Sequence, residues 1–129
     1  MIVDTSALVA IHEGEPEGAA FLEKLRHERE IKISAGTLLE ASIVLDGRHP
    51  GRTSRRLDRL MADLRIQVIA TDSEQVRVAR AAYRDFGRGS GHPAQLNYGD
   101  CFAYALASAT GEPLLFKGND LGHTDVRVA

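Results

Sequence analysis

Short apolar runs alternate with longer amphipathic stretches along the whole chain. The runs are too short for helices and are followed by polar or turn-forming residues, which is typical of buried strands. The predicted strands cover residues 1–3, 31–34, 65–70 and 113–116, and a fifth strand over 125–128 is left open. Helices separate the runs, so the strands are expected to pair in parallel. The pattern predicts an α/β fold, a three-layer sandwich around a central, mainly parallel sheet of four or five strands.

The amphipathic stretches predict six helices, at residues 5–12, 16–27, 37–46, 53–64, 72–86 and 99–110. Asp72 and Gln75 resemble a capping pair at the start of the fifth helix. The sixth helix is apolar almost all round, which predicts that it is buried. Gly and Pro place loops at 47–51 and 87–97. No repeat or linker interrupts the pattern, so residues 1–129 are expected to form one domain.

Composition excludes several classes of protein. Hydrophobic residues make up 43% of the 129, too many for a disordered chain and enough for a core without metal or disulfide support. No apolar run approaches the ~20 residues that span a bilayer, and the start of the chain lacks the pattern of a secretory signal. The single cysteine, Cys101, cannot form an internal disulfide. A cytoplasmic location without membrane contact is expected.

The net charge of −2 differs from the basic balance of most nucleic-acid coat proteins. It does not exclude a nuclease, because cations bound in an acidic site supply positive charge locally. Of the 16 basic residues 13 are Arg, and six of these lie within 48–65. Arg is well suited to phosphate contacts, although codon usage explains the Arg bias equally well. The stretch predicts either a solvated helix face or a track for an RNA backbone.

Three aspartates occupy positions at which parallel α/β folds bind ligands, beyond the carboxyl ends of the strands. Asp4 directly follows the first strand, Asp100 opens the apolar helix, and Asp120 follows the fourth strand after a short turn. Each also has an ordinary structural explanation. Asp4 can be a helix cap, Asp100 a favourable charge at the start of a helix, and Asp120 a turn former. Thr5 and Ser6 are candidates to hold a ligand water or a phosphate oxygen, or merely to cap the helix.

Glu40 lies within the third predicted helix and shares a face with Ile43 and Val44. A carboxylate on a core-facing stripe is costly unless it is paired or binds metal, the alternative being that it reaches solvent at the edge of the stripe. If the four carboxylates converge, they cannot ionise together without cations. Oxygen-only ligands select Mg²⁺ or Mn²⁺ over Zn²⁺. Such a site is suited to phosphodiester hydrolysis.

The segments that carry these residues resemble the PIN-domain family, and within it the VapC toxins of bacterial VapBC toxin–antitoxin pairs. The matching segments are residues 2–10, the helix around Glu40, 97–107, 114–121 and 124–126. They spread over the whole chain, and its length is typical of the family. The first and third segments together are the most specific.

The resemblance implies a Mg²⁺-dependent endoribonuclease, with Mn²⁺ as an alternative metal, that cuts structured RNA and inhibits translation. The resemblance implies that Asp4 and Asp100 bind the metal and that Glu40 and Asp120 belong to the acidic site. Asn119 stands where many members have a second Asp, which leaves the fourth acidic position open between Asp120 and Asn119. Homodimers are implied, as is neutralisation by a VapB antitoxin that can place a basic side chain in the acidic pocket.

Two other functions compete with the nuclease hypothesis. A phospho-receiver domain is also α/β, and Asp4, Asp72 and Lys117 imitate its aspartates and lysine. Receivers, however, carry adjacent acidic residues after the first strand, where this chain has Thr5 and Ser6. The second alternative is an inactive PIN fold that serves only as a binding module, against which the intact carboxylate set argues. No segment is typical of a helix-turn-helix or a basic arm, so this chain alone is not expected to bind DNA.

Overall fold

The computed structural model describes residues 1–48 and 53–129. Four strands form one parallel sheet in the order β3-β2-β1-β4. The strands are β1 (Ile2–Val3), β2 (Lys32–Ser34), β3 (Gln67–Ile69) and β4 (Leu114–Leu115). The predicted parallel α/β sheet of four or five strands is confirmed, and it has four strands in the described residues. Val128 makes only an isolated bridge to Leu114, so the end of the chain touches the sheet edge without forming a strand.

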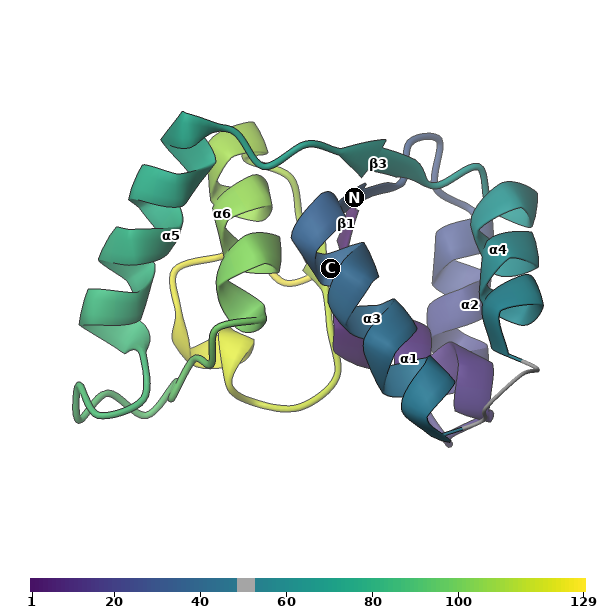
Figure 1. Ribbon diagram of the computed structural model, residues 1–129, viewed down its shortest axis with the longest axis horizontal. Coiled ribbons are helices and arrows are strands. Elements are labelled where there is room, and N and C mark those ends of the chain that lie inside the picture. Colours follow the sequence, from purple (N-terminus) through teal and green to yellow (C-terminus); the bar gives the residue numbers. More distant parts are fainter. Residues whose placement is uncertain (49–52) are drawn as a thin grey trace.

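Within the described residues, six α-helices and one short 3₁₀ helix connect and follow the strands (Figure 1). They are α1 (Thr5–Glu13), α2 (Gly18–Arg26), α3 (Ala35–Arg48), α4 (Thr53–Asp63), α5 (Ser73–Phe86), α6 (Asp100–Thr110) and η1 (Leu121–His123). All six predicted helices are present. Because β2 passes directly into α3, this helix begins before its predicted start, and it continues to Arg48, into the predicted loop 47–51. Gly47 and Arg48 therefore belong to this helix and not to a loop, and the remaining residues of the predicted loop, 49–51, lie outside the described residues.

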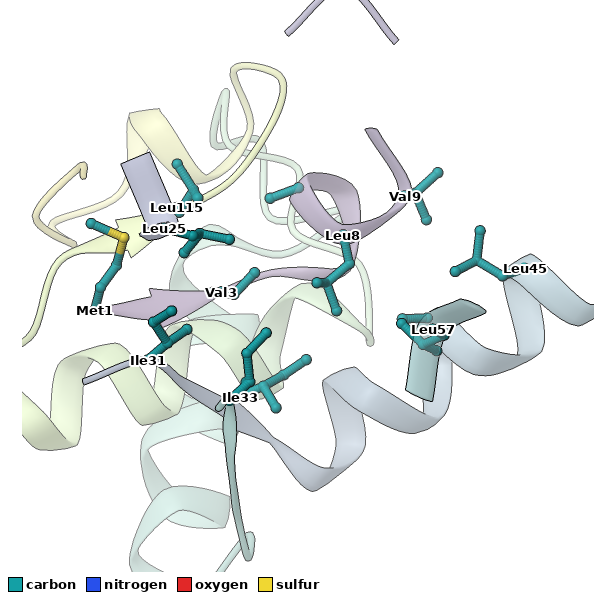
Figure 2. Packing of buried hydrophobic residues seen from close by; sticks show 13 residues of the cluster. Met1, Val3, Leu8, Val9, Leu25, Ile31, Ile33, Leu45, Leu57 and Leu115 are labelled. Atoms are coloured by element: carbon teal, nitrogen blue, oxygen red, sulfur yellow. The ribbon is translucent and has the colours of Figure 1, made fainter. Parts of the chain in front are cut away.

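The sheet separates two hydrophobic clusters, which makes the predicted three layers. Val3, Ile33 and Leu115 pack with α1 to α4 on one face, whereas Ile2 and Leu114 pack with α5, α6 and η1 on the other. Figure 1 shows α5 and α6 to the left of the strands and α2 and α4 to the right. Figure 2 shows the first cluster, in which side chains from the strands meet those of α1 and α2. Burial on both faces explains why β1 and β4 are short, continuous apolar runs, whereas β3 at the other edge of the sheet is largely exposed.

The start of α5 shows a capping interaction that the sequence predicts only in part. The Asp72 carboxylate accepts a hydrogen bond from the backbone N–H of Gln75 at 2.9 Å. The Gln75 side chain does not return to Asp72 but donates to the Ala70 carbonyl at 3.1 Å. Asp72 is therefore a helix cap.

In the described part of the chain, no helix combines the length and the apolar composition that crossing a membrane requires.

Ile33 and Val68 are register partners on β2 and β3, yet Ile33 is fully buried and Val68 is 50% exposed. We expect Ile33→Ala to lower the free energy of unfolding by about 2 to 5 kcal/mol, because it leaves a cavity beneath the helices. The matched change Val68→Ala should stay within about 0.5 kcal/mol, since solvent already reaches that side chain. Urea denaturation of both variants measures the difference. Equal losses would show that the helices cover both strands alike.

Candidate functional site

A cavity of about 460 Å³ opens at the carboxyl edge of the sheet. Its walls come from the start of α1, from α3, from the start of α6 and from the loop after β4. Three of the four predicted carboxylates line it, together with both predicted supporting residues of α1: Asp4, Glu40, Asp100, Thr5 and Ser6. Parallel strands place residues that are distant in sequence at one edge, which is where α/β folds bind ligands.

Asp4 leaves β1 and caps α1. Its Oδ2 accepts hydrogen bonds from the Ser6 N–H at 2.9 Å and the Ser6 hydroxyl at 2.6 Å. Its Oδ1 is buried and has no hydrogen-bond partner among the described residues. Burial raises the pKa of Asp4, while the Ser6 bonds oppose that rise. One oxygen therefore serves the cap and the other is left for a ligand, so the two interpretations of Asp4 are compatible.

Asp100 and Asn97 hold each other at the start of α6. The Asn97 N–H donates to Asp100 Oδ2 at 2.7 Å, and the Asp100 N–H donates to Asn97 Oδ1 at 3.0 Å. Burial, together with the charges of Asp4, Glu40 and Asp120, raises the pKa of Asp100 to about 6 against the lowering effect of the Asn97 bond. The charges of the other three predicted carboxylates therefore all act on Asp100.

Glu40 reaches the cavity from α3. Its Oε2 accepts a hydrogen bond from the Thr5 hydroxyl at 2.7 Å. Its carboxylate packs over Gly99, where any Cβ would overlap it, so a side chain at position 99 would displace Glu40. The expectation that Ile43 shares a core-facing stripe with Glu40 is wrong, because Ile43 is 64% exposed. The buried stripe of α3 consists of Thr37, Ala41 and Leu45.

Asp120 and Asn119 lie outside the cavity lining. Both are exposed, and the Asp120 side chain makes no capping bond at the start of η1. Asp120 is still near enough for its charge to raise the pKa of Asp100. Of the two, Asp120 alone carries a charge that acts on Asp100, and the role of each in the fourth acidic position stays a prediction.

The cavity lining also includes four polar side chains that the sequence did not identify as part of the site: Glu15, Arg48, Asn97 and Lys117. Asn97 had a local signal, since an Asn three residues before an Asp at a helix start is the spacing of a reciprocal cap. Lys117 had none, because it reaches the cavity through contacts across the fold. Its backbone N–H donates to Ser6 Oγ at 2.9 Å, and its Nζ lies 2.6 Å from Glu15 Oε2.

The donor set fits a hard divalent cation. Among the described residues, no three His, Cys, Asp or Glu side chains form a ready-made metal cluster. Mg²⁺ does not require one, because it keeps several waters and is commonly held by one or two carboxylates. Asp4 supplies a buried oxygen that has no partner in the described part of the chain, and Asp100 supplies a second carboxylate whose negative charge a cation would stabilise.

The sequence matches the family model for the PIN domain over residues 1–127. The chain belongs to the PIN-domain family. It is 52% identical to ribonuclease VapC42 of Mycobacterium tuberculosis over 129 residues, covering all of this chain and 98% of that protein. It is 51% identical to ribonuclease VapC28 of the same species, covering 100% and 97% of the two chains. This PIN domain is thus a VapC-type ribonuclease, the toxin class of toxin–antitoxin systems, as the sequence predicts.

Solved structures agree on the fold. Mycobacterium tuberculosis VapC20, a toxin that cleaves the sarcin–ricin loop, superposes with a TM-score of 0.76 over 99% of this chain and 97% of that one, at 14% identity. A toxin–antitoxin complex from Klebsiella pneumoniae gives 0.73 over 99% and 95%, at 18% identity. The phospho-receiver hypothesis is wrong for this PIN domain, whose Asp72 serves as a helix cap.

The raised pKa of Asp100 predicts a pH-dependent stability. Unfolding returns this pKa from about 6 to its ordinary 3.8, so ionised Asp100 destabilises the metal-free protein above pH ~6, and the penalty fades as the pH falls through 6 toward 3.8. At pH 7.5 in EDTA, Asp100→Asn should raise the free energy of unfolding by about 1 to 2 kcal/mol, allowing for partial solvent exposure. Urea denaturation at pH 4.5 should show a much smaller gain. An equal gain at both pH values would exclude this cause.

Proposed function

We propose that residues 1–129 act as one domain, a Mg²⁺-dependent endoribonuclease in which Mn²⁺ can replace Mg²⁺. The observation that carries the proposal is the buried Oδ1 of Asp4, which has no partner among the described residues. It belongs to the wall of a cavity that Glu40 and Asp100 also line. A buried, unsatisfied carboxylate oxygen beside two further carboxylates is costly without a cation.

Asp4 and Asp100 would hold the metal, each oriented by a hydrogen-bond donor of its own, Ser6 and Asn97. When bound, the metal supplies Lewis acidity, which activates water and stabilises the leaving oxygen. Glu40, which Thr5 holds at 2.7 Å, would orient the attacking water. Because water rather than the RNA 2′-hydroxyl attacks, the products should carry 5′-phosphate and 3′-hydroxyl ends. Asp120 would add negative charge at the edge of the site.

Asp4→Asn removes one charge and keeps the shape of the side chain. We expect it to lower RNA cleavage by roughly 100-fold or more, the scale on which one charge-stabilising group acts, without unfolding the protein. The exposed Asp85→Asn is the control and should cleave like the wild type. Cleavage should stop in EDTA, return with Mg²⁺ or Mn²⁺ and fail with Ca²⁺, which prefers a larger and looser coordination shell.

Analysis of the cleaved RNA ends completes this test. A 2′,3′-cyclic phosphate formed equally well in EDTA would mean a metal-free ribonuclease. Wild-type cleavage rates in Asp4→Asn would remove Asp4 from the site. Loss of cleavage in Asp85→Asn as well would show that the assay reports on folding rather than on chemistry.

We also propose a VapB-type antitoxin as the partner in a cytoplasmic toxin–antitoxin pair. The acidic cavity suits an Arg from such a partner, because guanidinium pairs bidentately with carboxylates. The solved VapBC2 complex of Rickettsia felis is bound to a promoter DNA fragment, and it superposes with a TM-score of 0.69 over 98% of this chain. We expect promoter DNA to be bound here only when the antitoxin is present, and a specific gel shift by this chain alone would contradict that.

A second copy of the chain is the proposed occupant of an exposed apolar surface, which we name the apolar face. It consists of Leu39 and Ile43 on α3, Val76 and Tyr83 on α5, and Tyr98 and Phe102 at the start of α6. Two shallow apolar hollows of about 250 and 330 Å³ share Tyr98 and Phe102, so the face is continuous. Tyr98 is 78% exposed. Exposed patches of this kind mark interaction sites, and a self-complementary pairing around a two-fold axis would cover both copies at once.

Ile43→Glu places a charge in the apolar face and should convert the dimer to a monomer in light scattering coupled to size exclusion. Burying an unpaired carboxylate in an apolar interface is unfavourable by several kcal/mol. Val128→Glu, at a 59% exposed position outside the face, is the matched control and should leave the dimer intact. A wild type that is monomeric throughout, or a dimer unaffected by Ile43→Glu, would contradict this use of the face.

A further inference from the structure

An RNA backbone must approach a cavity that is itself strongly negative. Four carboxylates line it: Asp4, Glu15, Glu40 and Asp100. Contacts between phosphates and basic side chains supply most of the affinity of proteins for nucleic acids, so a polyanion needs cations near this site. The basic side chains in the described lining are Arg48 and Lys117.

Arg48 stands at the end of α3 on the face that bears Glu40. Intervals of four residues separate Glu40, Val44 and Arg48, which places them on one side of the helix. All three line the cavity. The rise of a helix puts Arg48 about 12 Å beyond Glu40 along its axis. Arg48 is exposed and makes no ion pair with another described residue. Its guanidinium is thus available to a phosphate some way along the strand from the acidic residues.

Lys117 lies closer to the acidic residues. Its backbone N–H donates to Ser6 Oγ at 2.9 Å, and the Ser6 hydroxyl donates to Asp4 Oδ2 at 2.6 Å, so the position of Lys117 is coupled to that of Asp4. Its Nζ lies 2.6 Å from Glu15 and 3.1 Å from Glu17, two residues of the α1–α2 connection. All three side chains are at least 30% exposed. Ion pairs exposed to solvent contribute little to stability. Lys117 can therefore leave Glu15 and Glu17 and pair with a phosphate at a small cost in free energy.

We propose that Arg48 and Lys117 are substrate-binding residues, each holding an RNA phosphate at the rim of the acidic cavity. Lys117 takes the phosphate nearer the site and leaves Glu15 and Glu17 when RNA binds. Arg48 takes a phosphate farther along the strand. The two cations offset the repulsion between the backbone and the carboxylates, and they fix the direction in which the strand crosses the cavity. This inference rests on the proposed ribonuclease function.

Binding of a fluorescent RNA hairpin, followed by anisotropy, tests the two residues. All variants carry Asp4→Asn so that the RNA stays intact. Arg48→Ala and Lys117→Ala should each raise Kd about 5- to 20-fold. Each should also lower the slope of log Kd against log salt by about 0.7 to 0.9, the value of one phosphate contact. Arg48→Lys and Lys117→Arg should retain most of the affinity. Lys24→Ala, an exposed basic residue on α2, is the control and should match the parent.

With Asp4 intact, Arg48→Ala and Lys117→Ala should raise KM for a cleaved RNA by a similar factor and leave kcat within about twofold. A loss in kcat alone would mean that the residues shape the site rather than hold the substrate, and would overturn the proposal. Unchanged Kd and KM in both variants would overturn it too while leaving the ribonuclease function intact. A wild type that neither binds nor cleaves RNA would reject the ribonuclease function itself.

A separate experiment tests whether Lys117 leaves Glu15 and Glu17 to pair with a phosphate of the RNA. Glu15→Gln combined with Glu17→Gln frees Lys117 and should tighten RNA binding. Removing two negative charges also reduces the repulsion between the protein and RNA, whether or not Lys117 binds a phosphate. The Glu15→Gln and Glu17→Gln changes are therefore also made in a Lys117→Met background, which measures this contribution alone. The gain should be at least threefold larger when Lys117 is present, which is the signature of coupling between neighbouring residues. Equal gains in both backgrounds would show that Lys117 is not released by substrate.

Discussion

Repulsion between like charges is the constraint that this site is built to withstand. Three of the carboxylates that line this partly buried cavity each have a hydrogen-bond donor of their own: Ser6 for Asp4, Thr5 for Glu40 and Asn97 for Asp100. These donors orient the carboxylates without neutralising them. Burial and mutual repulsion still raise the pKa of Asp100 to about 6. A cation at the cavity would relieve a cost that the metal-free protein must otherwise carry.

The parallel sheet makes this convergence possible. Strands that run in one direction end at one edge, so residues 4, 40 and 100 meet although long stretches of chain separate them. Apolar clusters on both faces of the sheet hold the strands from which the site residues project. The hydrophobic core that supports the site is therefore built from residues other than the site carboxylates. Substitutions of the carboxylates can accordingly change chemistry without removing the fold.

Two surfaces of different character adjoin the same cavity. The apolar face reaches it through Glu40 and Val44, which line both the cavity and one of the apolar hollows. The basic rim of Arg48 and Lys117 borders it elsewhere. If the RNA backbone crosses the cavity as proposed, a chain with a net charge of −2 could still bind this polyanion, because Arg48 and Lys117 would lie where the backbone crosses. A partner on the apolar face and a substrate in the cavity would lie close enough to affect each other.

The sequence by itself determined the features that local patterns encode. Short apolar runs separated by helices predicted the parallel sheet, and the apolar pattern of 99–110 predicted a buried helix. The position of Asp4 directly after a strand was enough to mark it as a candidate ligand. Burial of Ile43 was predicted wrongly, because α3 has apolar residues on two sides and only packing shows which side meets the core. Helical periodicity cannot distinguish a core stripe from a surface that another molecule covers.

Only the tertiary structure decided which residues complete the cavity. Lys117 meets Ser6 across 111 positions of sequence and Glu15 across 102, and no local pattern predicts such contacts. The unsatisfied oxygen of Asp4 and the raised pKa of Asp100 likewise depend on burial and on neighbours from other segments. Hydrogen bonding, desolvation and charge repulsion act over distances of a few ångströms in space, whatever the separation along the chain. The sequence could therefore name the candidate carboxylates, while the fold determined how they are held and what surrounds them.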